Sequence, residues 1–146
     1  MTEVRGCKIP EELYYWVEKH VWVRDDGDDV VTVGITDVAQ HLANRVVAVT
    51  TKRPGKLLER GQSVATVESG KWVGPVPTPI NGEVLEVNPL LASQPTIVND
   101  DPYGAGWIVR LKATLWSVQR AEMHTGVHAV DEYRAFLEAQ GISCSP

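Results

Sequence analysis

Lys71 lies in a setting that favours chemical modification of its side chain. It belongs to the run Glu68-Ser69-Gly70-Lys71-Trp72, which begins at the end of a stretch rich in β-branched residues, Val64–Ser69, that predicts a strand. Gly70 predicts a turn in which a residue with a side chain would be strained, and prolines at 75, 77 and 79 keep the returning chain extended. The pattern predicts a stiff hairpin with a primary amine at its tip, which suits a side chain that is acylated and carries an arm outward.

An ordinary solvated turn lysine is the alternative, because most lysines in proteins lie at the surface. The elements around Lys71 therefore decide how it is interpreted. After the prolines, Asn81-Gly82 predicts a second turn, and Glu83–Val87 predicts another strand. The lysine would then project from a scaffold of short strands.

Short strands separated by turn residues make up most of the chain. Alternating or β-branched runs predict them at 13–16, 21–24, 30–35, 45–50, 64–69, 83–87 and 107–112. Thr36–Ala43 changes to helical periodicity, with Thr36 as the N-cap and with Val38 and Leu42 one turn apart. Helical segments are also predicted at 115–123 and 129–140, and Gly141 ends the second.

These elements predict a mainly β fold, with an antiparallel body, short helices and a C-terminal helix. No stretch resembles a linker, so we expect one domain over residues 1–146. Its core would span about residues 13–112, and its C-terminal helical segment about residues 115–140.

Composition narrows the classes of function. The chain has 146 residues, 43% hydrophobic and 23% charged, and a net charge of -5, which argues against a nucleic-acid partner. No apolar run approaches a membrane span, and Met1–Gly6 has no apolar signal-peptide core. We expect a cytoplasmic protein with no nucleic-acid or membrane partner.

Cys7 and Cys144 are the two cysteines of the chain. A structural disulfide would be unusual in a reducing cytosol, so the sequence favours two free thiols near mobile chain ends. The alternative is that one or both are redox thiols, which exchange with a partner or with a bound dithiol.

Motifs for independent catalysis or metal binding are lacking. The sequence has no phosphate-binding glycine loop, no G-x-S-x-G and no cluster with metal-ligand spacing. His124 and His128 are four residues apart and could share a helix face, but Gly126 between them disfavours a helix by about 1 kcal/mol. An incidental surface pair is the preferred interpretation, and we expect no metal and no catalytic residues.

Four segments in this order and spacing resemble the H protein of the glycine cleavage system. They are Val33–Gln40, Val67–Lys71, Pro79–Asn88 and Asn99–Trp107, and the resemblance runs from about His20 to Lys112. It implies a barrel-sandwich hybrid, in which two apposed sheets carry a modified lysine at a hairpin tip. It also implies lipoic acid in amide linkage to Lys71, attached by a lipoate ligase or lipoyl transferase that would recognise Glu68, Ser69, Gly70 and Trp72 beside it.

Departures from the usual H-protein pattern point to a subfamily. H proteins usually have Glu-Ser-Val-Lys-Ala around the lysine, whereas this chain has Glu-Ser-Gly-Lys-Trp followed by the proline-rich leg Val73–Pro77. That leg and the leader Gly6–Tyr15 are similar to the lipoate-binding proteins of the sulfur-oxidising, heterodisulfide-reductase-like pathway. The resemblance therefore implies a carrier of a sulfur-bound intermediate to such a complex, where Cys7 and Cys144 would be of more use.

Other functions remain open. The arm could instead carry an aminomethyl group among glycine cleavage components. The chain could also be an unmodified binding module with the same fold. A biotin carrier fits poorly, since methionines typically flank its lysine, and an independent enzyme fits worst because no nucleophile, base and pocket occur together.

Overall fold

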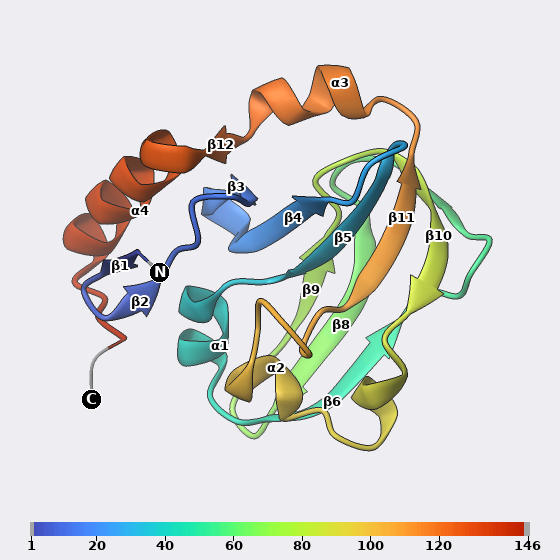
Figure 1. Ribbon diagram of the computed structural model, residues 1–146. Helices are drawn as coiled ribbons and strands as arrows, with labels where there is room; N and C mark the ends of the chain where they lie inside the picture. Colours follow the sequence, from blue (N-terminus) through green and yellow to red (C-terminus); the bar gives the residue numbers. More distant parts are fainter. Residues whose placement is uncertain (1, 145–146) are drawn as a thin grey trace.

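Two antiparallel sheets form the body of the protein in the computed structural model, which describes residues 2–144 (Figure 1). The larger sheet has seven strands in the order β12 (His124–Thr125), β3 (Tyr14–Trp16), β4 (Val21–Asp25), β5 (Val30–Ile35), β11 (Val109–Ala113), β10 (Gly82–Val87) and β7 (Leu57–Leu58). The smaller sheet has three strands in the order β6 (Val46–Thr51), β8 (Ser63–Ser69) and β9 (Val73–Pro77). The expected mainly β fold with apposed antiparallel sheets is confirmed.

Strand β9 lies at an edge of the smaller sheet, which explains how a strand can contain prolines. Pro75 has no N–H to donate to a ladder, and proline is tolerated at sheet edges for that reason. β8 and β9 pair antiparallel, with Glu68 opposite Val73 at the end of the hairpin. The predicted hairpin around Lys71 is therefore present.

Short helices connect the strands. They are η1 (Val17–Lys19), α1 (Asp37–Ala43), η2 (Pro89–Ala92), α2 (Ile97–Asp100), α3 (Trp116–Gln119), η3 (Arg120–Glu122) and α4 (Gly126–Gln140). The Thr36 hydroxyl accepts from the Ala39 N–H at 3.2 Å, as its predicted N-cap role requires. Within residues 2–144, no helix has the length and apolar character needed to cross a membrane.

The C-terminal segment differs in detail from the prediction. One helix was predicted over 115–123, but α3 and η3 divide that stretch. α4 begins at Gly126, before the predicted start at 129, and Gly126 has a left-handed φ of 60°, which glycine tolerates. His124 lies in β12 and His128 in α4, so they do not share one helix. Within the described residues, no group of three or more potential ligands could hold a metal ion.

The main core lies between the seven-stranded and the three-stranded sheet. A second apolar cluster lies where the N-terminal segment packs against α4. The main core takes buried side chains from both sheets, among them Val33, Leu111, Val64 and Val76. The second cluster packs Trp22 and α4 against the N-terminal residues, including β1 (Glu3–Val4) and β2 (Cys7–Lys8), which form a two-stranded sheet.

Cys7 and Cys144 form a disulfide, so the prediction of two free thiols near mobile ends is wrong. Their Cα atoms are 4.8 Å apart although 137 residues separate them in sequence. Cys7 is fully buried, and the Cys144 N–H donates to the Arg5 carbonyl at 2.9 Å. Both ends of the described chain are held by tertiary contacts, which local sequence patterns cannot reveal.

Candidate functional site

Lys71 lies at the tip of the β8–β9 hairpin and is exposed. The turn is closed by the Ser69 N–H, which donates to the Trp72 carbonyl at 2.7 Å. The Lys71 N–H donates more weakly to Ser69 Oγ, at 3.4 Å. The Lys71 amine makes no hydrogen bond or ion pair within residues 2–144, so the backbone of this residue is fixed while its nitrogen is available for acylation.

The two residues before the turn, Glu68 and Ser69, differ in exposure. Ser69 is only 6% exposed and supports the turn through its hydroxyl. Glu68 is exposed and makes no ion pair within the described part of the chain. Its carboxylate is therefore free for a partner that approaches the hairpin tip.

Gly70 does not play the conformational role predicted from the sequence. Its φ is not positive, and a Cβ added there would meet nothing within 4 Å. The backbone thus does not require glycine at this position. What Gly70 provides is a bare surface next to Lys71, and the turn itself is held by the hydrogen bonds of Ser69.

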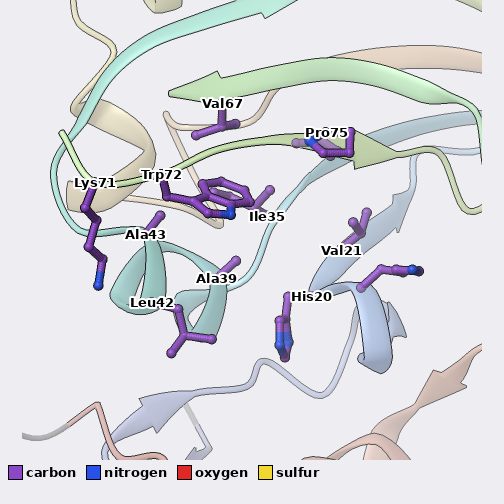
Figure 2. Close-up of a pocket in the computed structure, with 12 residues that line it drawn as sticks. His20, Val21, Ile35, Ala39, Leu42, Ala43, Val67, Lys71, Trp72 and Pro75 are labelled. Carbon is purple, nitrogen blue, oxygen red and sulfur yellow. The ribbon is translucent and has the colours of Figure 1, made fainter. Parts of the chain in front are cut away.

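Trp72 folds back from the tip and covers its own strand. Its indole lies so close to Gly74 that a Cβ at that position would collide with the ring. Gly74 is buried for this reason, although the Trp72 side chain remains 44% exposed. Figure 2 shows the ring extending toward Ile35 above α1.

An apolar pocket of about 400 Å³ lies directly beside Lys71 (Figure 2), within the usual range for small-ligand sites. Its lining comes from η1, β4, β5, α1, β8 and β9 and from the hairpin turn. The lining residues are Lys19, His20, Val21, Ile35, Ala39, Leu42, Ala43, Val67, Lys71, Trp72, Pro75 and Val76. An acyl chain on Lys71 would therefore have an apolar surface to pack against.

The wall formed by α1 is anchored at both ends. At its start, the Asp37 N–H donates to the Tyr103 hydroxyl at 2.9 Å, and the Asp37 carboxylate accepts from the Lys8 N–H at 2.8 Å. At its end, Asn99 accepts from the Val46 N–H at 2.9 Å and donates to the Asn44 carbonyl at 2.8 Å. These bonds hold the helix at a fixed distance from the hairpin.

His20 closes the pocket opposite Lys71, and it is neutral at pH 7. It adopts a left-handed φ of 57°, and its Nδ1 lies 3.3 Å from the Tyr133 hydroxyl. Its ring also packs edge-on against Phe136. Burial lowers the pKa of His20 to about 4, with the Glu18 carboxylate opposing the shift.

A second, polar hollow lies on the other side of Lys71. It is lined by Gln40, His41, Asn44, Arg45, Val47, Gly70, Lys71 and Asn99. Lys71 therefore stands between an apolar pocket and a polar surface, so a flexible arm attached to it could occupy either side.

The sequence pointed to the hairpin but not to the pocket. Glu68, Ser69, Gly70 and Trp72 adjoin Lys71 in the chain, and their recognition by a lipoylating enzyme stays a prediction. Cys7 and Cys144 line no part of the pocket. His20 and the residues on α1 were missed as site residues. The pairing of Val38 with Leu42 indicated a helix, but only the packing of distant elements shows that Leu42 faces Lys71.

The sequence and the fold have counterparts among known proteins. The family model described as glycine cleavage H-protein matches residues 13–140. The chain is 43% identical over 144 residues to glycine cleavage system H protein 2 of Aquifex aeolicus, covering 99% of this chain and 89% of that one. It is also 43% identical over 146 residues to the probable glycine cleavage system H protein 2 of Sulfurisphaera tokodaii, covering 99% and 98%.

A solved structure agrees with these matches. The crystal structure of a glycine cleavage system H protein from Mycobacterium marinum aligns with a TM-score of 0.67 and 32% identity, over 73% of this chain and 87% of that chain. The chain therefore belongs to the glycine cleavage H-protein family, whose members are non-catalytic components that carry a lipoyl group.

Proposed function

We propose that this chain is a lipoyl carrier, with lipoic acid in amide linkage to Lys71. The observation that carries the proposal is the exposed Lys71 amine, unpaired among residues 2–144, at a fixed hairpin tip beside an apolar pocket, in a member of the H-protein family. The residues fit the group, because the amine is available for acylation and the pocket offers apolar surface to an acyl chain. When bound, the lipoyl group supplies thiol–disulfide exchange chemistry.

The residues of the chain itself position the lipoyl arm. The β8–β9 hairpin holds the Lys71 backbone, so the arm starts from one fixed point. The apolar wall of α1 and β8 can hold the arm against the protein, and the open polar side leaves it free to reach a partner. Tethering raises the concentration of the arm at a docked partner to about the millimolar range.

A ligase assay tests this proposal. The purified chain is incubated with a lipoate ligase, ATP and lipoate, and the product is analysed by intact mass and peptide mapping. We expect one lipoyl adduct on the wild-type chain and none on Lys71→Arg. Lys56→Arg, which changes another exposed turn lysine, serves as the matched control and keeps the adduct. An adduct that survives in Lys71→Arg contradicts the proposal.

We further propose that the arm serves sulfur oxidation with a heterodisulfide-reductase-like complex. The supporting features are Trp72 with the Val73–Pro77 leg, and the Gly6–Tyr15 leader. The alternative is that the chain carries an aminomethyl group among glycine cleavage components, and the family names of the relatives fit it as well. An unmodified binding module is the second alternative.

Reconstitution separates the two carrier proposals. The lipoylated chain is combined with glycine decarboxylase and the other glycine cleavage components, next to a standard H protein. The sulfur proposal predicts little or no glycine decarboxylation by a fully lipoylated chain. Turnover at the rate of the standard H protein contradicts it.

We also propose that residues 1–146 act as one carrier domain in the cytoplasm.

A further inference from the structure

The pocket beside Lys71 is mainly apolar and has few lining groups that can carry a charge. Seven of its lining side chains are aliphatic: Val21, Ile35, Ala39, Leu42, Ala43, Val67 and Val76. Among the residues that the structure describes, no aspartate or glutamate lines it. Among its lining residues, the groups that can be charged are Lys19, His20 and Lys71.

Two of these three groups carry no charge in a loaded carrier. Burial keeps His20 neutral at pH 7 by lowering its pKa to about 4. Amide linkage would remove the charge of Lys71 itself. Lys19, which is exposed at the wall that η1 contributes, is then the remaining charged side chain of the pocket.

Nearby carboxylates are directed elsewhere. Glu68 lies opposite Val73 on the exposed face of the hairpin, and its neighbour Val67 is the residue that lines the pocket. The Asp37 carboxylate is engaged by the Lys8 N–H and by the Gln40 side chain, at 2.8 and 2.7 Å. Glu18 is exposed and does not line the pocket.

We propose that this pocket receives the arm when its end group is uncharged or negatively charged, with Lys19 as the counter-charge, and that it rejects an end group that is a cationic amine. The inference rests on the proposed function and names the class of cargo for the same site. A buried ammonium without a partner loses its hydration and gains nothing in return, whereas an anion near Lys19 is compensated.

The charge of the group that the arm carries therefore decides whether the arm can dock in the pocket. An aminomethyl group is a cation at neutral pH, and the apolar pocket gives it no carboxylate. An oxidised or reduced sulfur group is neutral or anionic, and the pocket accommodates it. The pocket thus discriminates by charge between the two cargoes proposed for this chain.

Three alkylated arms of similar size test the inference. The lipoylated chain is reduced, and its arm thiols are alkylated with iodoacetate, iodoacetamide or 2-bromoethylamine, which add an anionic, a neutral or a cationic end group. Peptide mapping confirms that the adducts are on the arm and not on Cys7 or Cys144. Docking of the arm is then measured from amide chemical shifts of Ala39, Ala43 and Val67 and from the Trp72 indole.

We expect the anionic and neutral arms to shift these resonances. The cationic arm should dock about tenfold less, because an unpaired polar group is costly to bury. Since Lys19 is exposed, it should favour the anionic arm over the neutral one only by about two- to fivefold. Equal or tighter docking of the cationic arm overturns the inference.

Charge-changing variants inside and outside the pocket show whether the pocket itself sets the preference among the three arms. Lys19→Glu should reverse the preference between the anionic and cationic arms, and Leu42→Glu, which places a carboxylate at a 39% exposed pocket position, should admit the cationic arm. Lys52→Glu changes the net charge equally at an exposed position outside the pocket and should leave the preference unchanged. If Lys52→Glu acts like Lys19→Glu, long-range charge and not the pocket sets the preference, and the inference fails.

The outcome separates this inference from the proposed function. If Lys71 acquires no lipoyl group, the carrier proposal fails and the inference with it. If Lys71 is lipoylated but all three arms dock alike, or none docks, the inference alone fails and the carrier proposal stands.

Discussion

Gly70 and Gly74 flank Lys71 and Trp72, and the structure gives them different roles. A side chain at Gly70 meets open space, whereas one at Gly74 meets the Trp72 ring. Glycine at position 70 therefore leaves the surface beside Lys71 bare for an approaching partner. Glycine at position 74 leaves room for the Trp72 indole to pack beside the pocket.

Alanine substitutions distinguish these roles. Gly70→Ala should leave the free energy of unfolding within about 0.5 kcal/mol of wild type or raise it slightly, because no contact is disturbed and the unfolded chain loses freedom. Gly74→Ala should displace the indole from the pocket and shift Trp72 fluorescence toward that of a solvated tryptophan. Trp72→Phe identifies which part of the emission belongs to Trp72. Unchanged Trp72 emission in Gly74→Ala would contradict the packing described.

His20 links stability to pH. Its pKa is about 4 in the folded chain, against an ordinary value of 6.5, so between these values the unfolded chain binds a proton that the folded chain does not. The stability due to neutral His20 is therefore complete above about pH 6.5 and is lost as the pH falls toward 4. The loss is at most about 3 kcal/mol.

His20→Asn tests this dependence, since asparagine tolerates the left-handed backbone at this position. The variant should lose less stability than wild type between pH 6.5 and 4 in denaturant unfolding experiments. All other titratable groups are the same in the two proteins, so the difference between the two curves reports His20. Parallel curves would show that His20 is not held neutral by burial.

Among the elements, α1 decides the shape of the pocket. Sequence patterns correctly predicted this helix, because the Thr36 cap and the Val38–Leu42 spacing are local. They did not show which side of the helix faces Lys71, because Asn99 and Tyr103, which fix its two ends, come from a distant segment. The hairpin was predictable for the same local reason, whereas the pocket between hairpin and helix was not.

Asn99→Ala should loosen the end of α1. It removes the acceptor of the Val46 N–H and the donor to Asn44, and we expect a loss of about 1–2 kcal/mol in stability. Hydrogen exchange of the amides at 41–44 should quicken. The neighbouring Asp100→Ala removes only an exposed ion pair with Arg45 and serves as the control, with an effect near zero. Equal exchange in the two variants would contradict the anchoring role of Asn99.

The disulfide joins segments near the two ends of the described chain, residues 2–144, over the second apolar cluster. The sequence could not predict it, because 137 residues separate the cysteines and the assumed reducing compartment argued against pairing. The mainly β fold, by contrast, was predictable from turn residues and from strand periodicity, which repeat along the chain.

Replacing both cysteines by serine should lower the free energy of unfolding by roughly 2–4 kcal/mol, because the unfolded chain is no longer closed into a loop. Denaturant unfolding with and without a reductant measures the effect, and the serine variant should be insensitive to the reductant. Lipoylation of Lys71 should persist in the variant, since neither cysteine lines the pocket. A wild-type midpoint that does not respond to full reduction would contradict a stabilising disulfide.

We propose that Lys71 carries a lipoyl group in the working protein. The most direct test is the intact mass of the chain isolated from its native cells, with peptide mapping of the hairpin between Ser63 and Pro77. We expect the added mass of one lipoyl group, located on Lys71. An unmodified Lys71 in cells whose other lipoyl proteins are fully loaded would contradict it and would favour a binding module that uses the same fold without an arm.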